Sequence, residues 1–155
     1  MLFRSGVARD VLAMRQRLRE AKPAEGALEA RNGPGRLMDI ELFAQTVALW
    51  SGSPATGVEA QLAAGAGSVL SQTAMQAVAD ACRLLWQVQA GTRLLTGGPL
   101  DLMTLGEGGR AFLLRETAMP TAAALIAAVD MRAELANTVI SRVLAERGAT
   151  GPGMT

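Results

Sequence analysis

The sequence predicts an all-α protein, an irregular helical bundle of about four main helices with short helical inserts. Apolar residues recur every three or four positions in four long segments, which is the spacing of an amphipathic helix. Half of the 155 residues are hydrophobic but only 3% are aromatic, so strand-forming residues are too scarce for a large sheet. Clusters of glycine and proline separate the segments, and this length is enough for one domain with a buried core.

We expect the first helix at about residues 7–21, ended by Pro23. The loop that follows could contain a short extended piece at 27–31. The apolar stripe of the helix is expected to contain Val7, Val11, Met14 and Leu18. The basic residues of this region lie mostly off that stripe: Arg9, Arg15, Arg17, Arg19 and Lys22. They form either a basic face for phosphate or an acidic partner, or a solvated surface whose cations suit the C-terminal end of the helix. The solvated surface is favoured because amphipathic surface helices commonly have this pattern.

The cluster Gly33-Pro34-Gly35 breaks the chain before the most informative helix, expected at about residues 37–50. The apolar stripe of this helix is Leu37, Ile40, Phe43 or Ala44, and Val47. Asp39 and Glu41 lie in its first turn, where the helix dipole favours anionic side chains by roughly 0.3–1 kcal/mol each. These two acids either only cap and charge the N-terminus of the helix, which is the more common role, or they face a neighbouring active site.

The remaining helices are expected at about residues 58–64, 72–95, 107–116 and 121–147. Ser68 or Ser71 is a candidate N-cap for the helix at 72–95. Pro120 suits the first turn of the helix at 121–147. The apolar face of 72–95 is expected to contain Met75, Val78, Cys82, Leu85 and Gln89, widened by Leu84 and Trp86. The stripe of 121–147 contains Leu125, Val129, Ala136, Val139 and Val143. Residues 1–147 thus form one helical domain, and residues 148–155 read as a disordered tail.

Composition excludes several kinds of chemistry. The chain has no histidine and one cysteine, so Ser-His and Cys-His catalysis, a disulfide framework and a zinc site built by this chain alone are excluded. Cys82 lies in an apolar helical pattern and is expected in the core. The net charge of +1 gives no general attraction for nucleic acid or an anionic membrane. We find neither an apolar run long enough for a membrane span nor a signal peptide, so we expect a cytoplasmic protein.

Residues 33–45 resemble a segment of bacterial glutamine synthetase adenylyltransferases, Gly-Pro-Gly-Gly-Leu-x-Asp-Ile-Glu-Phe-x-x-Gln. The matching residues are Gly33, Pro34, Gly35, Leu37, Asp39, Ile40, Glu41 and Gln45. The preceding helix with Lys22, and the downstream stretches 98–101, 107–108 and 112–114, resemble the flanking parts of the second, adenylylating half of these enzymes. The resemblance covers about residues 7–147. Two positions depart from the pattern, since Arg36 replaces the second glycine of the pair and Leu42 replaces the aromatic residue.

The resemblance implies the helical domain that follows the catalytic domain of a two-headed enzyme, which attaches AMP to glutamine synthetase and removes it. Such enzymes use ATP and Mg²⁺, and their partners include glutamine synthetase and the PII signal protein. Their catalytic Gly-Ser and Asp-x-Asp motifs do not occur here, so this chain is expected to be a fragment that lacks the nucleotidyltransferase domain, binds no cofactor and is inactive alone. Asp39 or Glu41 would then face the active site of the missing domain.

Two other interpretations remain open. One is a stand-alone helical module that binds a partner protein without catalysis. The other is the helical domain of the related uridylyltransferases, which the downstream resemblance to the adenylylating half disfavours. An Asp-x-Asp domain upstream in the same reading frame would distinguish an enzyme fragment from a stand-alone module.

Overall fold

A computed structural model describes residues 2–24, 26–96 and 105–149, and within these ranges it contains six helices and no strand. The predicted all-α class is therefore confirmed. The helices are α1 (Leu2–Ala21), α2 (Leu37–Ser51), α3 (Val58–Ala64), α4 (Gln72–Thr96), α5 (Glu107–Glu116) and α6 (Ala122–Ala149). Four of them are long and two are short, which agrees with the predicted four main helices and short inserts.

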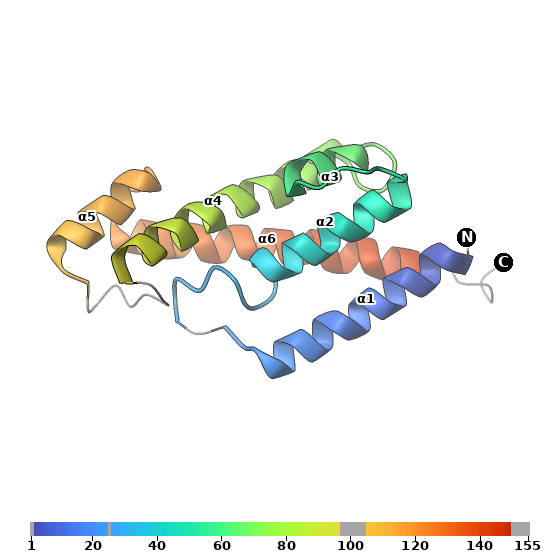
Figure 1. The fold of residues 1–155 in the computed structure, drawn as a ribbon, viewed down its shortest axis with the longest axis horizontal. Coiled ribbons are helices and arrows are strands. Elements are labelled where there is room, and N and C mark those ends of the chain that lie inside the picture. The colour runs from blue at the N-terminus through green and yellow to red at the C-terminus, as the bar shows by residue number, and fades with distance from the viewer. Residues whose placement is uncertain (1, 25, 97–104, 150–155) are drawn as a thin grey trace.

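Helix α6 runs along the length of the molecule and packs against both α1 and α4 (Figure 1). Arg15 on α1 contacts Ser141, whereas Arg19 contacts Asn137, so α1 and α6 run in opposite directions. Helix α2 packs against α1, α3 and α4, and α5 lies beside α4 and α6. Because α1 and α6 are antiparallel, the start of α1 and the end of α6 lie at the same end of the molecule (Figure 1).

The predicted stripe of α2 lies at the centre of the core. Leu37, Ile40, Phe43, Ala44 and Val47 are at most 2% exposed, so this helix is covered on one whole face. The predicted stripe of α6 is buried as well, and so is Cys82 on α4. Burying each of these larger aliphatic or aromatic side chains contributes about 1.5–3 kcal/mol relative to exposure.

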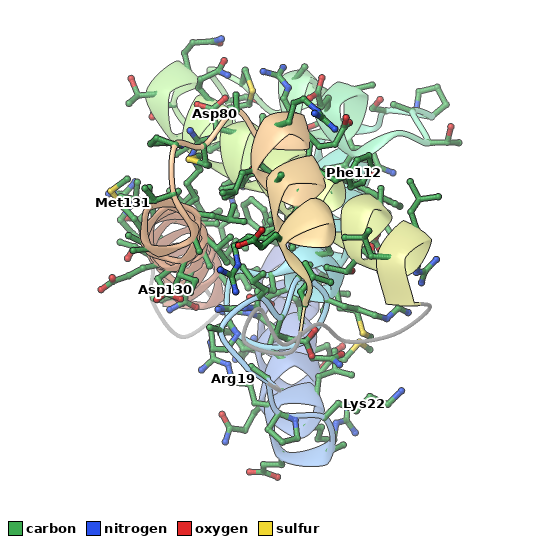
Figure 2. The ribbon with its side chains drawn as sticks, turned by 90° about the vertical axis from the view of Figure 1, so that its left-hand side faces the viewer. Arg19, Lys22, Asp80, Phe112, Asp130 and Met131 are labelled. Carbon is green, nitrogen blue, oxygen red and sulfur yellow. The ribbon has the colours of Figure 1, made fainter. Side chains whose placement is uncertain are left out.

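The buried face of α1 differs from the prediction. Met14 is 42% exposed, whereas Arg15 is only 5% exposed. Ala8, Val11 and Arg15 follow one another at intervals of three and four, so the buried stripe passes through Arg15 rather than Met14. The other basic residues fit a solvated surface better: Arg9, Arg17 and Lys22 are exposed, and Figure 2 shows Arg19 and Lys22 on the last turns of α1 and just beyond.

Several boundaries also differ. Helix α1 begins at Leu2 rather than Val7, since the residues before Gly6 are acceptable helix formers and one glycine costs only about 1 kcal/mol. The predicted tail was placed too early, because α6 continues through Gly148 to Ala149; residues 150–155 lie outside the described part. Pro120 precedes the helix, and Thr121 Oγ1 accepts a hydrogen bond from the Ala124 N–H.

The N-cap of α4 and the loop before α2 both serve helix N-termini. Ser71, not Ser68, caps α4, because its Oγ accepts a 3.1 Å hydrogen bond from the Ala74 N–H. The extended piece expected at 27–31 is a turn and an irregular stretch. The carbonyls of Ala30 and Arg31 accept hydrogen bonds from the first two N–H groups of α2, at 2.9 and 3.0 Å. This loop therefore satisfies the start of α2 instead of pairing as a strand.

Candidate functional site

The Gly-Pro-Gly turn puts positive φ angles only on glycine. Gly33 has φ +113° and Gly35 has φ +71°, whereas Arg36 is extended at φ −96° and ψ −179°. An extended backbone is open to any residue, so Arg36 needs none of the conformational freedom of glycine. The departure at position 36 from the resembled segment is therefore free of backbone strain.

Arg36 also adds contacts of its own. Its Nε donates a 2.7 Å hydrogen bond to the Glu29 carbonyl, and its Nη2 lies 3.6 Å from a carboxylate oxygen of Asp130 on α6. Since Asp130 is largely exposed, the ion pair itself contributes little. The hydrogen bond to Glu29 holds the preceding loop against the turn.

Gly35 lies directly against the backbone of α6. A Cβ atom on Gly35 would be 1.9 Å from the Ala133 carbonyl oxygen and 2.9 Å from the backbone nitrogen of Asn137. No side chain can occupy that space without moving the helix or the turn. Glycine at position 35 thus sets the distance between the start of α2 and the middle of α6.

Beside this contact, α1 and α2 are joined by a buried ion pair. Arg15 Nε donates to Asp39 Oδ1 at 2.5 Å and Arg15 Nη2 donates to Asp39 Oδ2 at 2.7 Å. The two residues are 5% and 8% exposed. The Gly35 N–H donates to Asp39 Oδ2 at 2.8 Å, so the carboxylate fixes the turn as well as the guanidinium. Paired, two-pronged contacts of this kind are the stronger class of charged hydrogen bond.

The remaining donors of Arg15 reach α6. Its Nη1 donates to Ser141 Oγ at 3.2 Å and its Nη2 donates to Asn137 Oδ1 at 2.8 Å. Arg19 Nη2 donates to the same Asn137 oxygen at 3.1 Å. We call Arg15, Asp39, Asn137 and Ser141 the Arg15 network. It joins three helices that are far apart in sequence and satisfies a charge that would be costly to bury alone.

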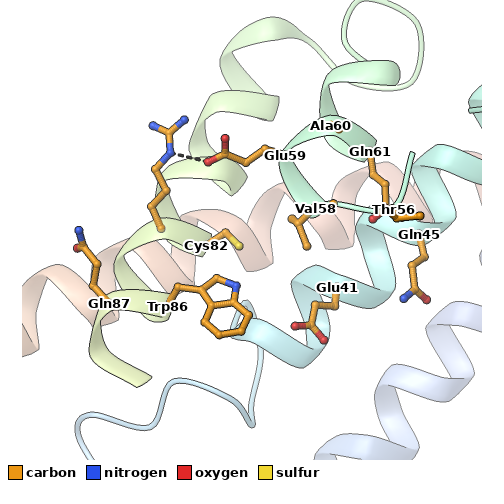
Figure 3. A pocket seen from close by; sticks show the side chains of 12 residues that line it. Glu41, Gln45, Thr56, Val58, Glu59, Ala60, Gln61, Cys82, Trp86 and Gln87 are labelled. Atoms are coloured by element: carbon orange, nitrogen blue, oxygen red, sulfur yellow. Dashed lines mark hydrogen bonds and ion pairs between the residues drawn. The ribbon is translucent and has the colours of Figure 1, made fainter. Parts of the chain in front are cut away.

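Asp39 and Glu41 occupy different environments, as expected for positions i and i+2 of a helix, which diverge by about 200°. Asp39 points into the Arg15 network, so its geometry favours a structural role. Glu41 is half-buried and lines a groove between α2, α3 and α4 (Figure 3). The two acids therefore cannot act on one ion or one substrate atom together.

The groove has a volume of about 710 Å³, within the usual range for ligand sites. Helix α2 supplies Glu41 and Gln45, the α2–α3 connection and α3 supply residues 56–61, and α4 supplies Cys82, Arg83, Trp86 and Gln87. Trp86 is 49% exposed, although its place on α4 predicted it to widen the buried face. It lies at the edge of that face, beyond the first residues of α3, Val58 and Glu59, so the indole stays partly uncovered (Figure 3).

The carboxylate of Glu59 is paired across the rim of the groove. Arg83 Nε donates to Glu59 Oε1 at 2.5 Å, and Arg83 Nη1 lies 3.7 Å from Asp80. The hydrogen bond from Arg83 lowers the pKa of Glu59. Because both side chains are more than half exposed, the pair contributes little to stability.

Cys82 forms part of the groove wall, and its thiol is hard to ionise. Burial, and then the negative charges of Glu41 and Glu59, raise the pKa of Cys82 from 9.0 to about 11. A folded-state pKa above the unfolded value stabilises the fold below pH 9.0, and this contribution is lost as the pH rises through about 11. We expect the free energy of unfolding to fall by about 2 kcal/mol between pH 9 and pH 11.

Denaturant unfolding of the reduced protein at pH 8, 9, 10 and 11 measures this loss, with Cys82→Ala as the matched variant. The chain has no tyrosine and one lysine, so few other groups titrate in this interval. Because Cys82 is buried, the variant is expected to be less stable at pH 8, but its stability should change little between pH 8 and pH 11. A decrease of equal size in both proteins would mean that Cys82 is not its source.

Among the described residues, no three histidine, cysteine or carboxylate side chains lie close enough to hold a metal ion. Within the same residues, no helix has the length and apolar character of a membrane span. No protein-family model, curated protein or solved structure matches this chain. The resemblance of residues 33–45 to the adenylyltransferase segment therefore remains a prediction.

The residue that sequence reasoning missed is Arg15. It was assigned to a solvated basic face, whereas it is the central donor of the Arg15 network. One available signal was its position, seven residues after Ala8 and four after Val11, on the apolar side of the helix. A buried arginine requires an acceptor, and Asp39 is the acid next to the breaker cluster.

Proposed function

We propose that this chain is the C-terminal helical domain of a nucleotidyltransferase that adenylylates and deadenylylates glutamine synthetase in nitrogen regulation. The observation that carries the proposal is the segment Gly33–Gln45, whose matched residues have distinct structural tasks. Gly35 allows close contact with α6, and Asp39 holds the turn to α1. The segment is thereby a rigid element at one end of α2, suited to support a neighbouring catalytic domain.

In this proposal the catalytic domain belongs to the parent enzyme and precedes the chain. That domain would hold ATP and Mg²⁺ with its Asp-x-Asp pair, and glutamine synthetase and the PII signal protein would be the partners of the whole enzyme. The helical domain would brace it. Of the two acids, Glu41 is the better candidate to face the neighbouring domain, because Asp39 is buried and engaged by Arg15.

The first test is the reading frame upstream of codon one, which should encode Gly-Ser followed by Asp-x-Asp. The second is AMP transfer from ATP to glutamine synthetase by the full-length enzyme. Glu41→Gln should lower the rate at least about fivefold, the effect of losing one charged contact of roughly 1 kcal/mol, with an unchanged melting temperature. Glu134→Gln, an exposed acid on α6, is the matched control and should leave the rate unchanged.

Absence of an upstream catalytic motif, or absence of AMP transfer by the full-length protein, would overturn the proposal. An unchanged rate in Glu41→Gln would overturn only the role of Glu41. The groove with the exposed Trp86 favours the alternative, a stand-alone module that binds a partner protein without catalysis. A stop codon directly upstream of Met1 would support that alternative.

A further inference from the structure

The groove contains one carboxylate, that of Glu41, for which the described residues supply no partner. Glu41 forms no hydrogen bond or ion pair with any residue that the structure describes, whereas Glu59 is bound by Arg83. The charged side chains that line the groove are Glu41, Glu59 and Arg83, so two negative charges and one positive charge leave a net charge of −1. The uncompensated charge therefore belongs to Glu41.

An exposed aromatic ring lies across the groove from this carboxylate. Figure 3 shows Glu41 extending from α2 toward the indole of Trp86 on α4. Trp86 is 49% exposed, so its ring is accessible from the groove. The face of an indole attracts a cation within about 6 Å of the ring centroid, and Trp is the strongest of the aromatic side chains in this respect. A carboxylate and an indole on opposite walls favour a cation between them.

We propose that this groove binds an arginine side chain presented by a partner polypeptide. A planar guanidinium can stack its face on the indole of Trp86 while two N–H groups on its edge donate to the carboxylate of Glu41, and a lysine ammonium offers neither the planar face nor the two-pronged edge. The volume of about 710 Å³ leaves room for neighbouring backbone. The exposed amides of Gln45 and Gln87 on the rim can bond to that backbone. This inference does not depend on the enzyme family of the chain.

The test uses the whole chain and the peptide acetyl-Gly-Arg-Gly-amide, followed by the ¹H–¹⁵N resonance of the Trp86 indole. The chain has two tryptophans, so Trp86→Phe assigns the signal. The arginine peptide should shift this resonance in a saturable way, and a peptide with citrulline, its neutral isostere, should not. Glu41→Gln should weaken binding about fivefold and Trp86→Leu about threefold. Because Trp86→Leu removes the indole signal, its binding is measured from the ¹H–¹⁵N resonances of the other residues that line the groove.

Two controls accompany these variants. Glu134→Gln removes an exposed carboxylate from α6 and should leave the affinity unchanged. Glu41→Lys reverses the charge in the groove and should abolish binding. Melting curves verify that each variant is folded, and both changed side chains are partly exposed, so folding should be retained.

Equal binding of the arginine and citrulline peptides would overturn the proposal, because the cation would then be irrelevant. The same holds if Glu41→Gln and Glu134→Gln bind alike, or if the arginine peptide leaves the Trp86 resonance unmoved. Free arginine amide should bind more weakly than the peptide. Equal affinities for the two would overturn the assignment of a polypeptide partner. None of these results bears on the upstream reading frame, so the two proposals can fail separately.

Discussion

Asp39→Asn is expected to destabilise the fold by about 3–5 kcal/mol. Asparagine has nearly the shape of aspartate but no charge, so the guanidinium of Arg15 would remain buried without a counter-ion. One donor of the variant amide would also face the donors of Arg15 or the Gly35 N–H. Urea unfolding followed by circular dichroism at 222 nm measures the loss, with the slope of the transition verifying that unfolding remains two-state.

Glu41→Gln is the matched control, because it makes the same chemical change two residues later on the same helix. Its carboxylate lies in the groove and has no internal partner among the described residues, so the change should stay within about 0.5 kcal/mol. A loss below about 1 kcal/mol in Asp39→Asn would mean that Asn137 and Ser141 suffice for Arg15. Replacing both members, Arg15→Met with Asp39→Leu, should restore much of the stability, because no unpaired charge then remains buried.

Gly35→Ala is the second large effect, expected at about 2–5 kcal/mol. The alanine would have to adopt φ +71°, which costs roughly 1–2 kcal/mol for an L-residue. Its Cβ would also lie 1.9 Å from the Ala133 carbonyl oxygen, so the turn or α6 must shift, at a further 1–3 kcal/mol or so. The same urea transition measures this loss.

Gly52→Ala separates these two contributions. Gly52 has φ +65° at the end of α2, and a Cβ there would meet nothing within 4 Å. It should therefore lose only the conformational part, roughly 1–2 kcal/mol. Equal losses at the two positions would contradict the proposed close contact between Gly35 and α6.

The features that could be predicted from the sequence are those that depend on local periodicity. The stripe Leu37, Ile40 and Val47 was identified because a helix repeats its buried face every three or four residues. The glycine and proline clusters located the breaks between helices, because these residues disfavour a helix through their own backbone properties. These signals decided the all-α class and most helix positions to within a few residues.

The features that could not be predicted depend on partners far along the chain. Nothing within α1 shows that Arg15 meets Asp39, 24 residues later, or Asn137 and Ser141 on α6. The exposure of Trp86 depends on where the short helix α3 begins to cover α4. The sequence of α4 alone does not show which side of an aromatic ring at the edge of its apolar face is covered. Asp39 and Glu41 were both predicted in the first turn of this helix, but only Asp39 lies there, and Glu41 follows as the fifth residue of α2. Tertiary packing then places the two carboxylates in different environments.

The distance in sequence between the members of the Arg15 network has a consequence for synthesis on the ribosome. Arg15 is made before its acceptors on α6, which follow more than 100 residues later in the chain. At a rate of about 5–20 residues per second, roughly 6–25 s pass before the acceptors on α6 have been made. During that interval α2 and Asp39 are already available to α1, but the side of α1 that packs against α6 stays exposed to water. An arginine on this side can remain solvated while it is exposed, and it becomes the hydrogen-bond donor that joins α1 to α6 once α6 packs.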